Sequence, residues 1–469
     1  MHSRVRGVAN RMTLTGYQAK NLASILLMGA KHGPFDMLRD IRRYPWLMDL
    51  LGVNGLLARL VENREGTYRT AVALVIEEVT RGMVDLLEGM FHRGDRLVIH
   101  EDMVPPEILH AMGLQPWMPE LLGILLPMLN PRAMERYLDA AENQGVPPDI
   151  CSLPRATMGV AYRGEFPPAR AIVTSNLPCD GGMASYTVMQ KITGLPAFRL
   201  DVPYDVSSER AHAYFAGELR AMIAWLEEHT PGRMDWDRLR DICGRRNRMA
   251  ELELEIWDMI RAKPAPMAGE AISLSHLWGF NVMPGRPSAV RMFERLADLT
   301  RKSLARGKGA NPREKHRVLL WNPPTLHYID LFVWAERAYG ASCIIDSMSF
   351  NRQPFIDTSS PETMLRGLAH NIMNGPMARH TRGPAANYFT DMFHLYSHFS
   401  MDMIWIAGHI GCKNTQALNG LLREDCRARG IPLLIIEYDL CDPRIVPRDG
   451  IRDQVDHFME NVMKEKRRA

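Results

Sequence analysis

The chain lacks a long hydrophobic run and an excess of either charge. No apolar run in its 469 residues reaches the roughly 18 residues that a membrane span needs. The most apolar segments, Asn21–Ala30 and Leu121–Leu129, are interrupted by polar residues or proline. Lys and Arg number 57 against 54 Asp and Glu, which leaves a net charge of only +3. This balance excludes a strongly basic nucleic-acid-binding protein. We therefore expect neither a membrane nor a nucleic acid as a partner.

Cysteine is scarce, and no secretory signal is evident. Seven cysteines, an odd number at low density, argue against a disulfide framework and favour a reducing, cytoplasmic setting. The basic N-terminus is not followed by a continuous apolar segment with a small-residue cleavage site. In a reducing compartment a cysteine is a small buried hydrophobe, a nucleophile or a metal ligand. The few cysteines therefore deserve individual inspection.

The remaining composition is that of a globular protein of several domains. Apolar residues make up 46% and charged residues 24%, which excludes a disordered or fibrous chain. Residues 1–140 show helical periodicity, apart from a possible strand at 96–100, and predict a helical N-terminal or capping domain. Residues 141–306 predict a first α/β domain with a helical extension, and residues 307–469 predict a second α/β domain.

Short apolar runs alternate with amphipathic helices in both predicted α/β domains. Strands joined through helices indicate parallel sheets covered on both faces. The expected fold class is therefore α/β, with two doubly wound parallel-sheet domains. The strands are expected at 171–175, 197–202, 317–321, 342–346, 401–407 and 432–438.

Four cysteines lie at or near the ends of these strands, where open parallel sheets bind ligands. Cys179 follows strand 171–175 in NLPCDGG, and Cys412 follows strand 401–407 in GHIGCKN. Cys151 precedes the first of these strands, in PPDICSLPR, and Cys441 follows strand 432–438 as a rival candidate. The other three fall inside predicted elements and are expected in the core: Cys243, Cys343 and Cys426.

The spacing of these cysteines does not decide their role. A thiolate at a strand end and helix N-terminus is electrostatically favoured, which suits a metal ligand or a nucleophile. The gaps are 28 residues (179 − 151) and 233 residues (412 − 179), unlike a zinc CxxC pair or a ferredoxin run. From the spacing alone, the cysteines are either ligands of one metal site or unrelated thiols.

Several segments of the chain resemble the 2-hydroxyacyl-CoA dehydratase and benzoyl-CoA reductase family. They are DICSLPRATMGVAY, ARAIVTSNLPCDGG, GLPAFRLDVPYD and the C-terminal GHIGCKNTQALNGLLREDCRARGIPLLIIEYDLCDPR. The stretch KPAPMAGEAISLSHL and the chain length are similar to the larger, alpha-type subunit. The resemblance covers about residues 95–465. One departure is Gly411, which stands before Cys412 where relatives tend to carry serine.

The resemblance implies a cofactor, partners and a reaction. It implies two flavodoxin-like domains per subunit and a [4Fe–4S] cluster held by Cys151, Cys179 and Cys412, whereas Cys441 stands where the family uses no ligand. Three thiolates leave one iron open to a substrate oxygen. A separate ATP-hydrolysing iron–sulfur activator would supply one low-potential electron, reducing the acyl-CoA thioester to a ketyl radical anion that loses its hydroxyl. A related smaller iron–sulfur subunit is the implied partner.

Other polar residues near these motifs are weaker candidates. Glu107 and His110 are the candidate catalytic residues, with Glu107 facing the open iron or the substrate, or else stabilising a helix N-terminus. Lys413 would tune the cluster by its charge or point to solvent, and His409 lies near the same strand end. Two further side chains are expected to brace the cysteine loops: Arg155 and Asp180.

The resemblance leaves three functions open. The PPEILHAMG segment favours an (R)-2-hydroxyacyl-CoA dehydratase. The nearest alternative is a subunit of an ATP-dependent benzoyl-CoA, or other aromatic acyl-CoA, reductase, in which the electrons stay in the ring. A third is an electron relay or scaffold, or a relative with a double-cubane cluster that acts on small molecules.

Overall fold

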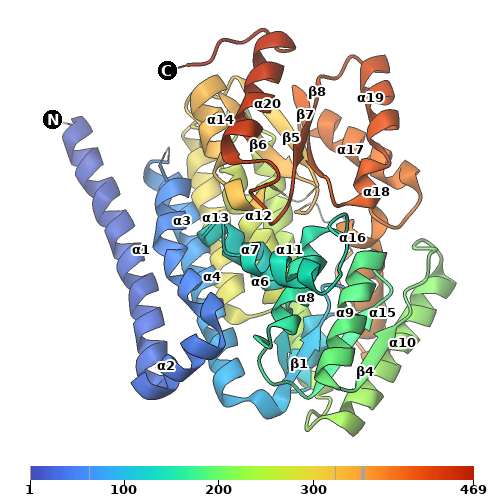
Figure 1. Cartoon of the computed structure of the whole chain (residues 1–469). Coiled ribbons are helices and arrows are strands. Elements are labelled where there is room, and N and C mark those ends of the chain that lie inside the picture. Colours follow the sequence, from blue (N-terminus) through green and yellow to red (C-terminus); the bar gives the residue numbers. More distant parts are fainter. Residues whose placement is uncertain (1, 63, 323, 350–353, 469) are drawn as a thin grey trace.

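The computed structural model describes residues 2–62, 64–322, 324–349 and 354–468 and contains two separate parallel sheets. Figure 1 shows them with helices on both sides, one sheet in each half of the molecule. The first sheet is formed by β1 (Leu97–His100), β2 (Gln115–Trp117), β3 (Ala171–Ser175) and β4 (Ala197–Leu200). The second is formed by β5 (His316–Trp321), β6 (Ala341–Asp346), β7 (Met403–His409) and β8 (Leu433–Tyr438).

The two sheets have the same strand order. The order is β2-β1-β3-β4 in the first and β6-β5-β7-β8 in the second, and every neighbouring pair is parallel. This order is that of the first four strands of a flavodoxin-like doubly wound sheet, in which the order reverses beside the first strand. Every residue of β1, β3, β6 and β7 is buried, as expected for strands covered on both faces. The predicted fold class is confirmed.

The first sheet begins earlier in the chain than expected. Strand β1 matches the possible strand at 96–100, but β2 was not anticipated, and both strands precede residue 141, where the first α/β domain was expected to start. Strand β2 is only three residues long, with Pro116 at its centre. Proline is tolerated there because β2 is an edge strand.

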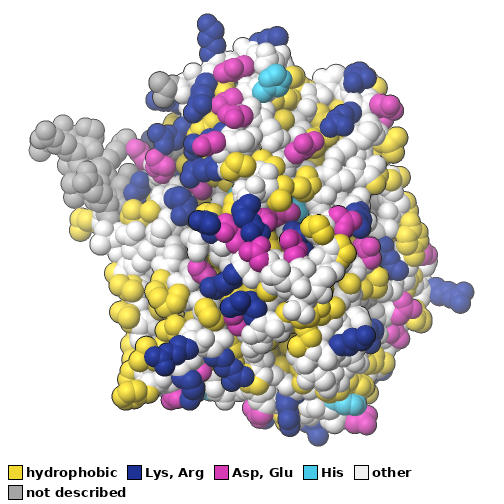
Figure 2. Space-filling view, in the orientation of Figure 1, with side chains coloured by type: hydrophobic (Ala, Val, Ile, Leu, Met, Phe, Trp, Pro, Cys, Tyr) yellow, Lys and Arg dark blue, Asp and Glu magenta, His cyan; other side chains and the backbone are white. Residues whose placement is uncertain are grey.

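The N-terminal helices form a layer beside the sheets. Helix α4 packs against α1 on one side and α13 on the other. Figure 1 shows α1 at the outer edge of the molecule, and Figure 2 shows hydrophobic side chains over α2 and the adjoining end of α1, where Leu26 and Phe35 are exposed. These elements are α1 (His2–His32), α2 (Pro34–Arg43), η1 (Pro45–Gly52), α3 (Val53–Leu60) and α4 (Gly66–His92).

The remaining helices surround the sheets. Those of the first half and its extension are η2 (Gly94–Arg96), α5 (Pro106–Ala111), α6 (Glu120–Leu129), α7 (Glu135–Asn143), α8 (Ser152–Tyr162), α9 (Asp180–Thr193), α10 (Glu209–His229), α11 (Trp236–Ile260), α12 (Gly269–His276), η3 (Leu277–Val282) and α13 (Pro287–Ala305). Those of the second half are η4 (Leu326–Tyr328), α14 (Leu331–Tyr339), α15 (Pro361–Asn374), α16 (Pro376–Arg379), α17 (Ala385–His398), α18 (Lys413–Gln416), α19 (Asn419–Ala428) and α20 (Arg448–Asn461). In the described part of the chain, no helix is long and apolar enough to cross a membrane.

Helix α15 connects the two halves. It lies between β6 and β7 in sequence but packs against α10 of the first half. Its first turn is fixed by a capping box, in which the Ser360 side chain accepts from the Thr363 N–H while the Thr363 side chain accepts from the Ser360 N–H. This stretch carried no predicted element, so the connection is a finding of the structure.

A buried arginine connects the N-terminal helices to both the extension and helix α14 of the second half. Arg64 is fully buried, and its Nε donates to Glu270 at 2.7 Å. Its Nη2 donates to Glu270 at 2.9 Å and to Glu336 at 3.0 Å, and its Nη1 donates to the Ala310 carbonyl at 3.2 Å. Since Arg64 neutralises two buried carboxylates, its removal would leave uncompensated buried charge.

We predict that Arg64→Met lowers the free energy of unfolding by about 3–5 kcal/mol, because both carboxylates lose their counter-charge. Urea denaturation followed by circular dichroism measures the change. The matched control is Arg337→Met, which breaks an ion pair with Glu62 whose side chains are both 58% exposed, and it should cost less than about 1 kcal/mol. Equal effects of the two substitutions would contradict the prediction.

Candidate functional site

The carboxyl ends of both sheets open onto one cavity of about 490 Å³. Glu101 follows β1 and Cys179 follows β3 of the first sheet, while Asn322 follows β5 and Cys412 follows β7 of the second. The pairs β1/β3 and β5/β7 flank the positions where the strand order reverses. Ligands of doubly wound sheets bind at such positions, so the cavity combines the favoured sites of both sheets.

The three cysteines predicted as ligands all line this cavity. Each is the residue immediately before a helix: Cys151 before α8, Cys179 before α9 and Cys412 before α18. All three thiols are partly buried. The fold thus brings together residues that lie 28 and 233 positions apart in sequence. Cys441 does not line the cavity, because its Sγ donates to the Gly123 carbonyl at 3.4 Å.

His409 contacts the thiol of Cys151. Its Nε2 lies 3.1 Å from Cys151 Sγ, and its Nδ1 accepts from the Leu440 N–H at 3.1 Å. Because a backbone N–H can only donate, Nδ1 carries no proton and Nε2–H points to the sulfur. Burial lowers the pKa of His409, which keeps the ring neutral. The ring therefore donates a hydrogen bond to Cys151.

The two side chains predicted to brace the cysteine loops, Arg155 and Asp180, make different contacts. Arg155 Nη1 donates to Glu142 at 2.9 Å and to the Pro148 carbonyl at 2.8 Å, which fixes the segment before Cys151. The Asp180 carboxylate accepts only from its neighbouring Gly181 N–H at 3.0 Å among the hydrogen bonds of the described residues. Lys413 lines the cavity, yet its Nζ forms an exposed ion pair with Asp149 at 3.5 Å.

Gly411 is required by the close approach of two loops. A Cβ on Gly411 would lie 2.8 Å from the Cα of Cys151 and 3.1 Å from the His409 ring. A backbone atom cannot move aside as a flexible side chain can, so a larger residue would push the Cys412 loop away from Cys151. This contact accounts for glycine at the position where the family resemblance led us to expect serine.

Burial, rather than the helix termini, dominates the ionisation of the Cys151 and Cys179 thiols. It raises the pKa of Cys151 well above the ordinary thiol value and raises the pKa of Cys179, although backbone N–H groups at both helix starts oppose the shift. In the metal-free chain, burial therefore outweighs the stabilisation that the helix N-termini were expected to give these two thiolates. A bound metal would restore it, since coordination deprotonates a thiol outright.

The arrangement fits a cluster better than a single metal ion. Within the described residues, no three His, Cys, Asp or Glu side chains are placed to share one ion. In a cubane cluster each thiolate binds a different iron, so its sulfurs stand further apart than the ligands of one ion. Three partly buried cysteines line one cavity of about 490 Å³, and thiolates are the ligands that such clusters use.

Three carboxyl groups of raised pKa in the cavity wall were not predicted. Glu101 Oε2 accepts from Ser175 Oγ at 2.7 Å, whereas its buried Oε1 has no hydrogen-bond partner. Burial raises the pKa of Glu101 well above its ordinary value, that of Asp102 to about 6 and that of Glu120 to about 8. Glu101 and Asp102 directly follow the anticipated strand 96–100, so the strand-end rule that located the cysteines would have found them.

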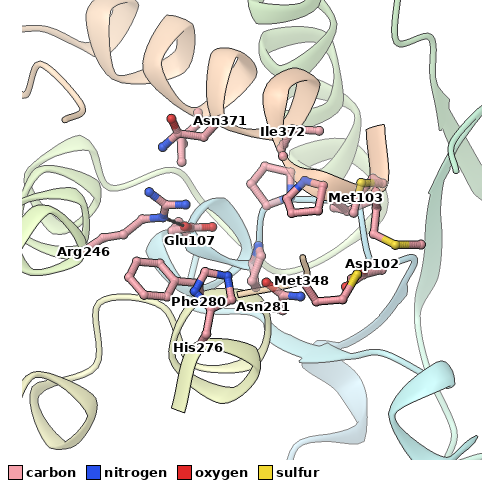
Figure 3. A pocket seen from close by; sticks show the side chains of 17 residues that line it. Asp102, Met103, Glu107, Arg246, His276, Phe280, Asn281, Met348, Asn371 and Ile372 are labelled. Atoms are coloured by element: carbon pink, nitrogen blue, oxygen red, sulfur yellow. Dashed lines mark ion pairs between the residues drawn. The ribbon is translucent and has the colours of Figure 1, made fainter. Parts of the chain in front are cut away.

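The two candidate catalytic residues lie outside the cysteine cavity. Glu107 is buried in the wall of a neighbouring pocket of about 90 Å³, where its Oε1 forms an ion pair with Arg246, 2.9 Å from Nε. Figure 3 shows this ion pair at one side of the pocket. His110 lines neither the cysteine cavity nor this pocket, and its Nε2 is buried without a hydrogen-bond partner. Their catalytic roles stay predictions.

Comparison with known proteins agrees with the family resemblance. The family model described as 2-hydroxyglutaryl-CoA dehydratase, D-component, matches residues 103–462. The chain is 27% identical over 157 residues to the alpha subunit of (R)-2-hydroxyglutaryl-CoA dehydratase from Acidaminococcus fermentans, an alignment that spans 33% of each chain. It is 21% identical over 417 residues to one of the subunits of benzoyl-CoA reductase from Thauera aromatica, covering 82% of this chain and 93% of that one.

We predict that alkylation of Cys151 by iodoacetamide in the metal-free chain keeps accelerating beyond about pH 9.5, the pH at which a thiol of ordinary pKa, about 8.5, levels off. The raised pKa preserves the neutral thiol to higher pH, and only the thiolate reacts. Site-specific rates come from mass spectrometry of quenched samples. The urea-unfolded chain serves as control and should level off normally; a plateau below pH 8 in the folded chain would refute the expectation.

Proposed function

The chain belongs to the 2-hydroxyglutaryl-CoA dehydratase D-component family, and we propose that it is the iron–sulfur subunit of an ATP-activated radical (R)-2-hydroxyacyl-CoA dehydratase. The observation that carries the proposal is the convergence of Cys151, Cys179 and Cys412 on one cavity at the ends of both sheets. These thiols lie on three separate loops that meet at the cavity. Cysteines without a shared role would not need to meet there.

In this proposal Cys151, Cys179 and Cys412 hold a [4Fe–4S] cluster. When bound, such a cluster would supply a low-potential electron and one iron open to the thioester oxygen or hydroxyl of the substrate. His409 supports the site by donating to the sulfur of Cys151, a hydrogen bond of the kind that tunes cluster potentials. The walls of the cavity restrict water around it, because they come from both halves of the chain.

The carboxyl groups of the cavity supply protons for dehydration. Loss of a hydroxyl as water needs a proton donor, and a carboxylic acid donates at neutral pH only when its pKa is raised. Glu101 and Glu120 meet this condition through burial. Glu101 also has one carboxyl oxygen without a hydrogen-bond partner, which leaves it free to contact a substrate.

The proposed enzyme works with other proteins. Both relatives are named as subunits of larger enzymes, which supports a hetero-oligomer. We propose a related smaller iron–sulfur subunit as the partner, and a separate ATP-hydrolysing iron–sulfur activator as the source of the electron. ATP would then act only through that activator, with an acyl-CoA as substrate.

We predict about four iron and four acid-labile sulfide per chain after anaerobic purification, and their loss in Cys412→Ala. Colorimetric iron and sulfide assays measure both. The matched control is Cys441→Ala, which removes a nearby thiol that does not line the cavity and should retain the cluster. About eight irons would favour the double-cubane alternative. No iron in the wild-type chain would refute the cluster and leave a scaffold.

The second candidate is a subunit of an ATP-dependent aromatic acyl-CoA reductase. It is favoured by the alignment with the benzoyl-CoA reductase chain, which covers 82% of this chain. The two activities differ in their use of electrons. A dehydratase returns its electron after each turnover, whereas a reductase leaves electrons in the product.

We predict many product molecules per electron supplied when the assembled enzyme, activator and ATP convert an (R)-2-hydroxyacyl-CoA. Reductant oxidation and product are followed together, by absorbance and liquid chromatography. A fixed ratio of two electrons per product with an aromatic acyl-CoA would establish the reductase instead.

A further inference from the structure

The pocket that holds Glu107 adjoins the cysteine cavity. Asp102 and Met377 contribute to the walls of both. Figure 3 shows Asp102 and Met103 at one side of this pocket, and Asn371 and the Arg246–Glu107 ion pair at the other. Asp102 and Met377 therefore stand at the boundary between the two spaces.

Among the described residues, Asn371 is a buried amide without a hydrogen-bond partner. Its side chain lies on α15 and lines the pocket, and the residue is only 7% exposed. Neither its Oδ1 nor its Nδ2 has a hydrogen-bond partner. Burying an unpaired amide is unfavourable, so a group that both donates and accepts is needed to satisfy it.

The charges in the pocket are already compensated. Arg246 is paired with Glu107 at 2.9 Å, and its guanidinium lies over the Phe280 ring at 5.3 Å. His276 is held by buried Glu253, with 2.8 Å between Nδ1 and Oε1. The carboxyl group of Asp102 adds a further acidic group. Among the described residues, the lining therefore offers a carboxylate no cation that lacks an acidic partner, and the acidic groups would repel one.

Apart from Asn281, the rest of the wall is apolar and adaptable. Met103, Met348, Ile372 and Met377 line the pocket between its two ends. Methionine side chains accommodate aliphatic groups of varied shape because they are unbranched and flexible. A short hydrocarbon chain fits this wall, with its polar end at Asn371.

We propose that this pocket binds the end of the acyl group remote from the thioester, and that this end is a neutral hydrogen-bonding group, a carboxamide or a hydroxyl, held by Asn371. The inference rests on the proposed function, because it takes the cysteine cavity to receive the thioester. A carboxylate end would lack a counter-charge, and a hydrocarbon end would leave the Asn371 amide unpaired.

The test compares three acyl-CoA thioesters of nearly equal shape. Their acyl groups end in a carboxamide (4-carbamoylbutanoyl-CoA), a carboxylate (glutaryl-CoA) or a branched hydrocarbon (5-methylhexanoyl-CoA). Dissociation constants are measured by anaerobic calorimetry on the full chain. We expect the carboxamide to bind at least about tenfold more tightly than either of the others.

Substitution of Asn371 assigns the preference to this pocket. Asn371→Leu keeps the side-chain size and should abolish the preference for the carboxamide, while the hydrocarbon analogue binds as well as before. The matched control is Arg366→Ala on the exposed side of the same helix, where Arg366 is paired with Glu209, and it should preserve the order of affinities. Circular dichroism checks that both variants fold.

The outcomes separate this proposal from the one on which it rests. Equal affinities, tightest binding of the carboxylate, or a preference that survives Asn371→Leu would overturn the assignment of the pocket and leave the acyl-CoA function intact. No binding of any thioester would overturn the proposed function and this inference together.

Discussion

The candidate site depends on one geometric constraint, which is that parallel strands end at the same edge of their sheet. Two sheets of identical strand order direct these edges to one cavity, and the loops after β1, β3, β5 and β7 meet there. Because the loops are short continuations of buried strands, their positions follow from the sheets. Buried Arg64 and the packing of α15 on α10 in turn connect the N-terminal helices and the two halves.

The second determinant of the site is low polarity. Burial raises the pKa of the Cys151 thiol and of Glu101 and Glu120, so these three groups are neutral acids at neutral pH in the metal-free chain. Such groups store protons and bind metals only after releasing them. A cavity of this kind suits proton transfer beside a cluster better than the binding of a free anion.

Sequence patterns predicted what is local and missed what depends on distant contacts. The strand-end rule located Cys179 and Cys412, because a buried strand and the following loop are adjacent in sequence. Strand β2 has only three residues around Pro116, too few to show a period. Asn371 was beyond reach, since its significance comes from the placement of α15 against the first half, and no local pattern encodes that packing.

The equal strand order has a consequence for the rigidity of the molecule. β3 and β7 occupy the same position in their sheets, so Cys179 and Cys412 are counterparts contributed by different halves, whereas Cys151 lies in the segment before β3. A group bound by all three thiols would cross-link the halves. Any rotation of one half against the other would change the separation of the sulfurs and be resisted by the metal–sulfur bonds. Loading the site would thus add a bonded link between the two halves to the contacts that already hold them together.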